Sequence, residues 1–233
     1  MKVNVILEGS LRGPCESTVV VVDVLRATSS AVTAFANGLT QLEVVESVEE
    51  ARRMKRENSE LLIAGERRGL KPSGFDLGNS PCEFTENEVK GKKLVMTTSN
   101  GTRAIKRFLG NRVVYLAALL NYRFVARSIV ESGEGTTIVC AGTDGVPCLE
   151  DVFCAGSIVK ELMCEGYRID DAARIAYSTY STYEFDIERM LKKESSHGAY
   201  LERIGLGEDL VYCARMNIHD VTPFSQGKRF VLH

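Results

Sequence analysis

Short apolar runs alternate with stretches of helical periodicity through most of the chain. Residues 19–22 are four consecutive valines, which is typical of a strand buried on both faces of a sheet. A short polar turn follows, and apolar residues at helical spacing over 31–39 predict a helix. The runs at 93–96 and 137–140 are followed by the same succession of turn and helix. We therefore expect the three polar turns to converge at one edge of a sheet.

The same patterns define the rest of the chain. They predict further strands at 3–7, 42–45, 61–64, 113–117, 210–214 and 229–232, a loop at 8–16, and helices at 47–57, 121–131, 149–163, 170–176, 185–194 and 196–205. Strands that alternate with helices indicate an α/β fold. We expect one domain over 1–233, a three-layer sandwich with a mostly parallel or mixed central sheet and helices on both faces. The residues from about 165 are expected to extend that sheet with antiparallel edge strands.

Composition narrows the range of partners. The chain has 233 residues, a net charge of -2, 7% aromatic residues and no Trp, so a basic or base-stacking surface for nucleic acid is not expected. Seven scattered cysteines without a CxxC pair are typical of reduced thiols in the cytoplasm. We find no signal peptide and no apolar run of the ~18 residues that a membrane span needs. A cytoplasmic protein without a membrane partner is predicted.

The turn after the 19–22 strand contains charged residues whose position in the fold can be predicted. Asp23 comes directly after the valine strand, and Arg26 and Thr28 lie between it and the following helix. In open α/β sheets, ligands bind in the crevice at the carboxyl ends of the strands. The sequence therefore predicts that this carboxylate and this guanidinium face a ligand.

A second candidate is the glycine- and proline-rich loop at 65–81, too long to be a simple connection. One interpretation is a compact surface loop with a solvated basic tip. The other is that Arg67, Arg68 and Lys71 bind anionic oxygens, while Glu66 orients an arginine or holds a cation.

The turn after the 93–96 run is rich in hydroxyl and amide groups. Free N–H groups at a helix start, hydroxyls and one arginine would form an anion-binding cradle, although the same residues are also ordinary helix caps. Its candidate residues are Thr98, Ser99, Asn100, Gly101, Thr102 and Arg103.

The third turn holds carboxylates. Asp144 lies between glycines, and Glu150 and Asp151 open the next helix. Acidic residues in a first helical turn often only complement the helix dipole, but several carboxylates near Asp23 would also suit Mg²⁺. His197, beside a later helix start, is either a surface residue near the helix cap or a phosphate ligand or proton donor.

Several common site motifs are missing from the sequence. No GxGxxG follows a strand, and neither a GxxxxGK[ST] loop nor a GxSxG elbow occurs, so dinucleotide binding, P-loop hydrolysis and serine-hydrolase chemistry lack their motifs. Haloacid-dehalogenase-type phosphatases carry a second aspartate two residues after the first. No aspartate follows Asp23 at that spacing, so the analogy does not assign Asp23 as a phosphorylated nucleophile.

Four stretches in this order resemble the 2-phosphosulfolactate phosphatase (ComB) family of coenzyme M biosynthesis: VVVDVLRATSSAVTAFANG, AGERRGLKPSGFDLGNSP, TTSNGTRAI and CAGTDGVPCLEDVFCAG. SSHGAYLERIGLGEDLVYCA resembles the family's C-terminal part. The resemblance implies Mg²⁺-dependent hydrolysis of (2R)-O-phospho-3-sulfolactate to 3-sulfolactate and phosphate.

The resemblance and the turns together give a set of expected roles. Asp23, Glu150 and Asp151 would hold Mg²⁺, with Glu66 as a fourth ligand. The 97–103 turn would bind phosphate, and the 66–71 loop would bind the sulfonate or carboxylate and close over the substrate. The base is either Asp144 or Asp23, or Asp23 is a nucleophile. Alternatives are a broader phosphatase of small phosphorylated acids and a non-catalytic protein that binds anionic metabolites; a homodimer is also expected.

Overall fold

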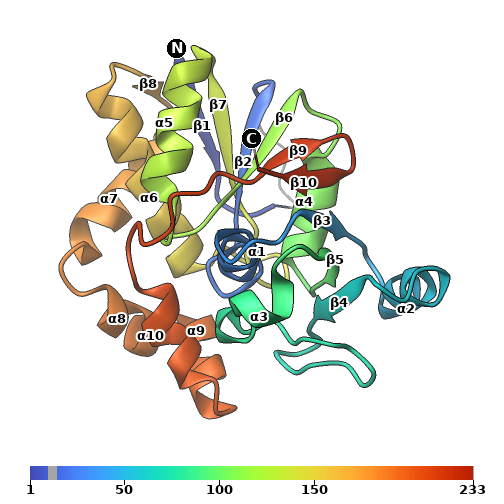
Figure 1. Cartoon of the computed structure of the whole chain (residues 1–233). Coiled ribbons are helices and arrows are strands. Elements are labelled where there is room, and N and C mark those ends of the chain that lie inside the picture. Colours follow the sequence, from blue (N-terminus) through green and yellow to red (C-terminus); the bar gives the residue numbers. More distant parts are fainter. Residues whose placement is uncertain (10–14, 233) are drawn as a thin grey trace.

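In a computed structural model that describes residues 1–9 and 15–232, the chain forms one ten-stranded sheet in the order β4-β5-β3-β10-β9-β6-β2-β7-β1-β8 (Figure 1). The strands are β1 Lys2–Ile6, β2 Thr18–Val22, β3 Gln41–Val44, β4 Leu62–Gly65, β5 Lys93–Thr97, β6 Val113–Ala117, β7 Thr136–Cys140, β8 Arg168–Ile169, β9 Phe224–Gln226 and β10 Arg229–Val231. Only the pairings of β9 and β10 are antiparallel among the described strands.

The helices fill the connections between these strands. They are α1 Ala27–Ala36, α2 Val48–Glu57, the 3₁₀ helix η1 Pro81–Glu83, α3 Glu86–Val89, α4 Gly101–Phe108, α5 Tyr122–Ser132, α6 Leu149–Cys164, α7 Asp171–Tyr183, α8 Ile187–Arg189, the π-helix η2 Met190–Glu194, α9 Ser196–Arg203 and α10 Gly207–Cys213. Ser47 caps α2 by accepting the N–H of Glu50, as the capping-box spacing predicts.

The sheet is covered on both faces. Val20 and Val22 of β2 pack with α5, α6 and α7, whereas Val19 and Val21 pack with α1 and α4 on the other face. Helix α2 packs on β4 and β5 at the far end of the sheet. The predicted three-layer α/β sandwich is confirmed, and Figure 1 shows α5 to α7 side by side against β1 and β7.

Two expectations about the C-terminal part are wrong. The 210–214 segment forms most of α10 rather than a strand, because Leu210 and Cys213 are buried one helical turn apart. The antiparallel hairpin β9–β10 lies in the middle of the sheet, between β6 and β3, rather than at an edge. The fully buried Phe230 of β10 joins the core there.

The hairpin also changes the direction of the sheet. Each step from β3 to β10, β9 and β6 is antiparallel, so the strands on either side of the hairpin run in opposite directions. The expected convergence of the three turns is nevertheless observed, because residues of all three line one cavity. The carboxyl ends of β2 and β5 also meet, because Gly101 after β5 lies against Asp23 after β2.

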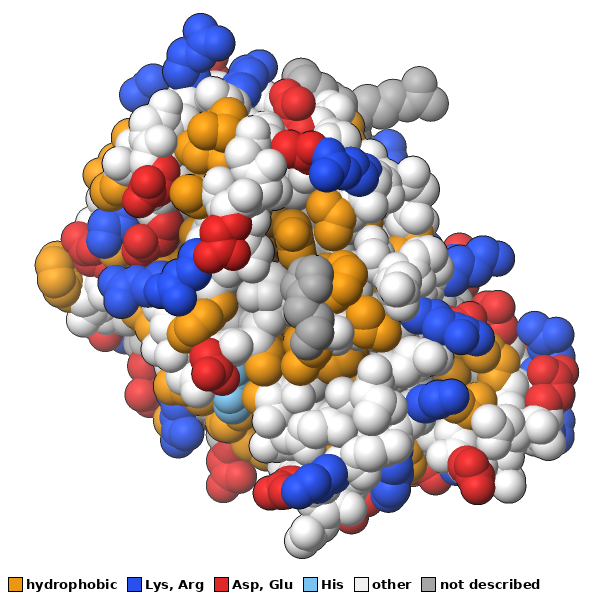
Figure 2. All heavy atoms as spheres, turned by 45° about the horizontal axis from the view of Figure 1, so that its top comes forward, with side chains coloured by type: hydrophobic (Ala, Val, Ile, Leu, Met, Phe, Trp, Pro, Cys, Tyr) orange, Lys and Arg blue, Asp and Glu red, His pale blue; other side chains and the backbone are white. Residues whose placement is uncertain are grey.

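The surface is mixed in character. On the face in Figure 2, hydrophobic side chains gather near the centre, and basic and acidic side chains are interspersed towards the periphery. No helix in the described part of the chain is both long and apolar enough to cross a membrane. The predicted 8–16 loop lies largely outside the described residues.

Candidate active site

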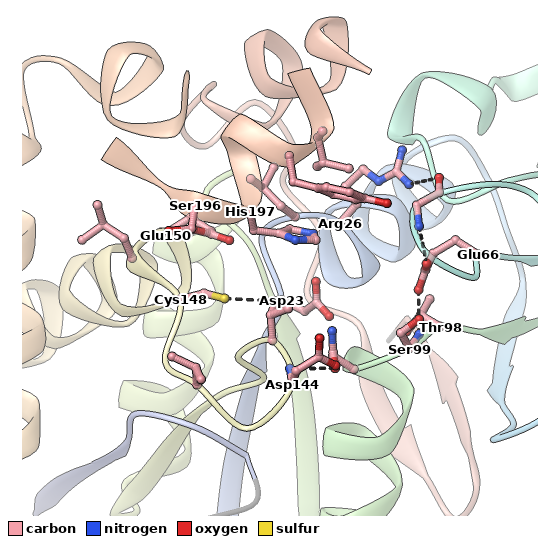
Figure 3. A pocket seen from close by; sticks show the side chains of 18 of the residues that line it. Asp23, Arg26, Glu66, Thr98, Ser99, Asp144, Cys148, Glu150, Ser196 and His197 are labelled. Carbon is pink, nitrogen blue, oxygen red and sulfur yellow. Dashed lines mark hydrogen bonds between the residues drawn. The ribbon is translucent and has the colours of Figure 1, made fainter. Parts of the chain in front are cut away.

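A cavity of about 780 Å³ opens where the turns after β2, β4, β5 and β7 meet. We call these turns, residues 23–26, 66–69, 98–100 and 143–150, the floor. The segment 190–213, which contains η2, α9 and α10, lies over them, and we call it the cover. Figure 3 shows Glu150 and Glu66 on opposite sides of Asp23, with His197 entering from the cover.

Asp23 is held at the end of β2 by its own neighbourhood. Its Oδ1 accepts the N–H of Ala27 at 3.0 Å, and the Thr28 hydroxyl bonds both the N–H and the C=O of Asp23. Burial raises the pKa of Asp23 to about 7, aided by the charges of Glu66 and Glu150 and opposed by the Ala27 N–H and by Arg26. The Asp23 carboxyl can therefore exchange a proton near neutral pH.

Thr28 occupies a different place from the one predicted. It is fully buried beneath Asp23 and is not part of the cavity lining, so the structure gives it a positioning contact rather than a contact with the ligand space.

The 98–103 turn uses most of its polar groups internally. The hydroxyls of Thr98 and Thr102 each accept the other residue's N–H at 3.1 Å. Arg103 donates to the carbonyl of Ser99 and to Oδ1 of Asn100, and lines a second cavity of about 490 Å³. The structure thus brings Thr98, Ser99 and Asn100 to the main cavity and leaves Thr102 and Arg103 behind it.

Gly101 allows the close approach of β5 to β2. A Cβ at this position would lie 2.3 Å from Oδ2 of Asp23 and 2.6 Å from Cβ of Ala27. No side chain fits there, so a glycine is required by contact with the central carboxylate.

Glu66 connects two parts of the floor. Its Oε1 accepts the N–H of Ser99 at 2.6 Å and its Oε2 accepts the N–H of Gly69 at 2.7 Å. The side chain is buried and lines the cavity. Glu66 thus fixes the 66–69 turn against the 98–100 turn.

The three basic residues of the 66–71 loop have separate surroundings. Arg67 binds Thr97 and the carbonyls of Glu66 and Glu46, and Lys71 is exposed with its Nζ 3.4 Å from the carbonyl of Asp76; neither lines the cavity. Arg68 does line the cavity.

Arg26 faces the cavity and is paired with an acid that the sequence did not indicate. Its guanidinium donates to Oδ2 of Asp209 at 2.5 Å and to the carbonyl of Gly69 at 2.7 Å. Ser80 donates to the other oxygen of Asp209 at 2.5 Å. Asp209 was missed because it lies beside a segment that was interpreted as a strand, although two acidic residues after Gly207 are a helix-start signal.

The acidic residues near β7 separate into two kinds. Glu150 lines the cavity, and its Oε2 accepts the hydroxyl of Ser195 at 2.7 Å. Asp151 does not line it; its two oxygens accept the N–H groups of Val24 and Gly142, which ties the ends of β2 and β7 together. Burial and the charges of Asp23 and Glu150 raise the pKa of Asp151. Asp144 is exposed at the rim, in a left-handed conformation with φ 51°.

The cover contributes residues from far along the chain. His197 and Tyr200 of α9 line the cavity, and the Tyr200 hydroxyl donates to the carbonyl of Arg68. Ser195 caps α9 by accepting the N–H of Gly198 and also binds Glu150. Sequence reasoning found His197 but missed Ser195 and Tyr200; the helix-cap position of Ser195 was the available signal.

Cys148 also lines the cavity and was not singled out by the sequence. Its thiol donates to the Thr143 hydroxyl at 3.1 Å. Burial, together with Glu150 and Asp151, raises its pKa, so it stays a thiol rather than a nucleophilic thiolate.

The charges around the cavity do not balance. Five carboxylates, Asp23, Glu66, Asp144, Glu150 and Glu194, and two guanidinium groups, Arg26 and Arg68, line the cavity. Arg26 is paired with Asp209 and Glu194 with Arg189, which leaves four carboxylates and one guanidinium group. A cavity of this composition repels an anion unless a cation is added.

The donor atoms suit Mg²⁺, which takes oxygen ligands and usually binds through one or two carboxylates, waters and phosphate. Among the described residues, Asp23 and Glu150 each keep one carboxylate oxygen without a hydrogen bond, whereas both oxygens of Glu66 and Asp151 accept N–H groups. No cluster of three His, Cys, Asp or Glu side chains within 1–9 and 15–232 is arranged to hold a metal. Two carboxylates with an open side fit the ion's requirements.

The fold and the cavity together define an α/β protein with a polar pocket of the size that binds a small molecule. The chain belongs to the 2-phosphosulpholactate phosphatase family, whose model matches residues 7–228. The resemblance of the sequence motifs is thereby confirmed, and the family is one of phosphoric monoester hydrolases.

Curated relatives cover most of the chain. A protein of Pseudothermotoga lettingae is 41% identical over 213 residues, 91% of both chains. One of Caldanaerobacter subterraneus subsp. tengcongensis is 40% identical over 89% of this chain and 87% of its own. One of Deinococcus radiodurans is 42% identical over 87% and 85% respectively. Each is named "Probable 2-phosphosulfolactate phosphatase".

Proposed function

We propose that this protein hydrolyses (2R)-O-phospho-3-sulfolactate to 3-sulfolactate and phosphate, and that it requires Mg²⁺. Membership of the family and the names of the relatives support the reaction. The excess of carboxylates around the cavity supports the need for a cation, because the substrate itself carries phosphate, sulfonate and carboxylate charges. This charge imbalance is the observation that carries the proposal.

Asp23 and Glu150 would hold the ion, because both line the cavity and each has a carboxylate oxygen without a hydrogen bond. Mg²⁺ held there would supply positive charge beside the phosphate oxygens. Because the pKa of Asp23 is about 7, this carboxyl would have to lose its proton to hold the ion.

The remaining steps use the protein's own groups. Ser99 and Asn100, on the rigid turn fixed by Glu66, face the phosphate. His197 enters from the cover, where it can donate a proton to the leaving 2-oxygen, and Asp144 at the exposed rim accepts the proton of the attacking water. Transfer of a phosphoryl group depends mainly on positioning and charge, which are the properties this floor provides.

The test is phosphate release from 2-phospho-3-sulfolactate, 2-phospholactate and phosphoglycolate, each with Mg²⁺ and with excess chelator. We expect metal-dependent release that favours the sulfonated substrate. Equal kcat/KM values for all three would instead identify a broader phosphatase of small phosphorylated acids. Binding without release from any of them, by folded and Mg²⁺-supplied protein, would identify a metabolite-binding protein and refute the proposal.

A further inference from the structure

Asn79 has a buried side-chain amide whose oxygen lacks a hydrogen-bond partner. It is 4% exposed and lines the main cavity, and its Oδ1 has no hydrogen-bond partner. Within the described part of the chain, the only other buried side-chain atom in this condition is Oδ1 of Asn4, on β1. A buried polar atom without a partner costs free energy, which a contact with a ligand would recover.

The surroundings of Asn79 keep it at the wall of the cavity. Its carbonyl accepts the hydroxyl of Ser30 at 2.7 Å. The next residue, Ser80, binds Asp209, which in turn holds Arg26. Asn79 therefore belongs to the part of the wall that carries Arg26, and its backbone is fixed on both sides of the amide.

The two parts of the cavity offer different chemistry. Around Asp23 and Glu150, carboxylates suit a cation and the strongly charged phosphate. Around Arg26, the groups are a guanidinium already neutralised by Asp209 and the uncharged amide of Asn79. Sulfonate oxygens are weakly basic and poor ligands for Mg²⁺, so a sulfonate is recognised best by N–H donors such as these.

We propose that the side-chain amide of Asn79 binds the sulfonate of the substrate and thereby selects for it; this inference rests on the proposed function. The N–H₂ group donates to a sulfonate oxygen beside Arg26. The amide oxygen and nitrogen exchange places by rotation about the last side-chain bond, so the anion draws the N–H₂ group towards itself.

The experiment compares Asn79→Ala with wild type on 2-phospho-3-sulfolactate and on 2-phospholactate, which has a methyl group in place of the sulfonated carbon. We expect kcat/KM for the sulfonated substrate to fall roughly 10- to 100-fold and kcat/KM for 2-phospholactate to change less than about 2-fold. Both values come from one preparation, so a loss of folded protein cancels in their ratio. Asn4→Ala is the matched control, because it removes the other buried amide oxygen without a partner, which lies outside the cavity lining, and should leave the ratio unchanged.

If Asn79→Ala leaves the ratio of the two kcat/KM values unchanged, whether both values fall equally or neither falls, the assignment is overturned. Calorimetric titration with 3-sulfolactate and with lactate separates this result from a failure of the proposed function. If wild type releases no phosphate, weaker binding of 3-sulfolactate by Asn79→Ala, with Asn4→Ala unaffected, would still support the sulfonate contact. Identical 3-sulfolactate affinities in wild type and Asn79→Ala would refute it.

Discussion

The floor and the cover of the cavity differ in how they are built. Floor side chains are held by main-chain N–H groups of nearby turns, as Asp23 is by Ala27 and Glu66 is by Gly69 and Ser99. The cover is anchored by apolar side chains buried in the core, such as Leu191 and Leu201, and it meets the floor through side-chain contacts between distant residues, such as Ser195 with Glu150 and Asp209 with Arg26.

This difference indicates a division of work. Groups held by backbone turns at strand ends keep a fixed geometry, which the reacting centre requires. Apart from His197, the proposed proton donor, the cover adds residues that position the non-reacting part of the substrate and exclude water. We therefore expect substitutions in the floor and of His197 to lower kcat, and the other substitutions in the cover to act on KM and on stability.

Substitution of the central carboxylate should have the largest effect. Asp23→Asn keeps the shape of the side chain but removes the charge, so we expect kcat to fall by at least about 10³-fold. The protein should stay folded, because an uncharged group replaces a buried carboxylate whose pKa is already raised. Steady-state kinetics and thermal melting measure both effects, with the exposed Asp186→Asn as control. Near-normal activity would contradict the assigned role of Asp23.

The second-largest effect is expected for Gly101→Ala, which adds a methyl group next to the floor. In Gly101→Ala the new Cβ would meet Oδ2 of Asp23 at 2.3 Å and must displace it. Because small misplacements of reacting groups are costly, we expect kcat to fall about 10- to 100-fold. Gly110→Ala is the matched control, since a Cβ at Gly110 meets nothing within 4 Å. Full activity of Gly101→Ala would show that the approach of β5 to β2 does not position Asp23.

The third prediction concerns the cover and its buried acid, Asp209. Asp209→Ala leaves the guanidinium of Arg26 buried without its counter-ion, and we expect a loss of about 3–5 kcal/mol in the free energy of unfolding. Denaturant titration measures this loss, and KM should rise more than kcat falls. A stability close to that of wild type would mean that the pair does not hold the cover.

The raised pKa values predict a pH dependence of the metal-free protein. The folded state retains a proton on Asp23 up to about pH 7, whereas the unfolded state loses it near 3.8, so the free energy of unfolding should fall as the pH rises between these values. The raised pKa of Asp151 also makes the free energy of unfolding fall as the pH rises. Thermal melting in chelator across this range measures the trend, and Asp23→Asn should flatten it. A stability that rises with pH in wild type would contradict the raised values.

The smallest effect is expected for Arg103. The sequence alone placed Arg103 in the turn that was expected to bind phosphate. The Arg103 guanidinium binds Ser99 and Asn100 from outside the main cavity. We therefore expect Arg103→Ala to change KM by only about 2- to 5-fold. A 100-fold rise in KM would contradict this expectation and support a direct contact between Arg103 and the phosphate.

The sequence predicted the floor well because its signals are local. A strand followed by a polar turn and a helix identifies Asp23, Glu66, Ser99 and Glu150 within a few residues of strands or helices that the structure confirms. Hydrophobic periodicity likewise located nearly all the strands of the sheet.

The cover and the sheet order could not be predicted in this way. The Arg26–Asp209 pair joins residues 183 positions apart, and periodicity carries no information about such contacts. The same limit applies to the β9–β10 hairpin, whose place in the middle of the sheet depends on tertiary pairing. Asn79 was overlooked because only three-dimensional burial shows that its amide oxygen has no partner.

The need for a cation over the acidic floor is tested most directly by the initial rate of phosphate release from 2-phospho-3-sulfolactate as a function of free Mg²⁺, for wild type and Asp23→Asn. The account predicts a saturable dependence in wild type, no rate in excess chelator, and no recovery of Asp23→Asn at any Mg²⁺ concentration. Full activity of wild type in excess chelator would contradict it.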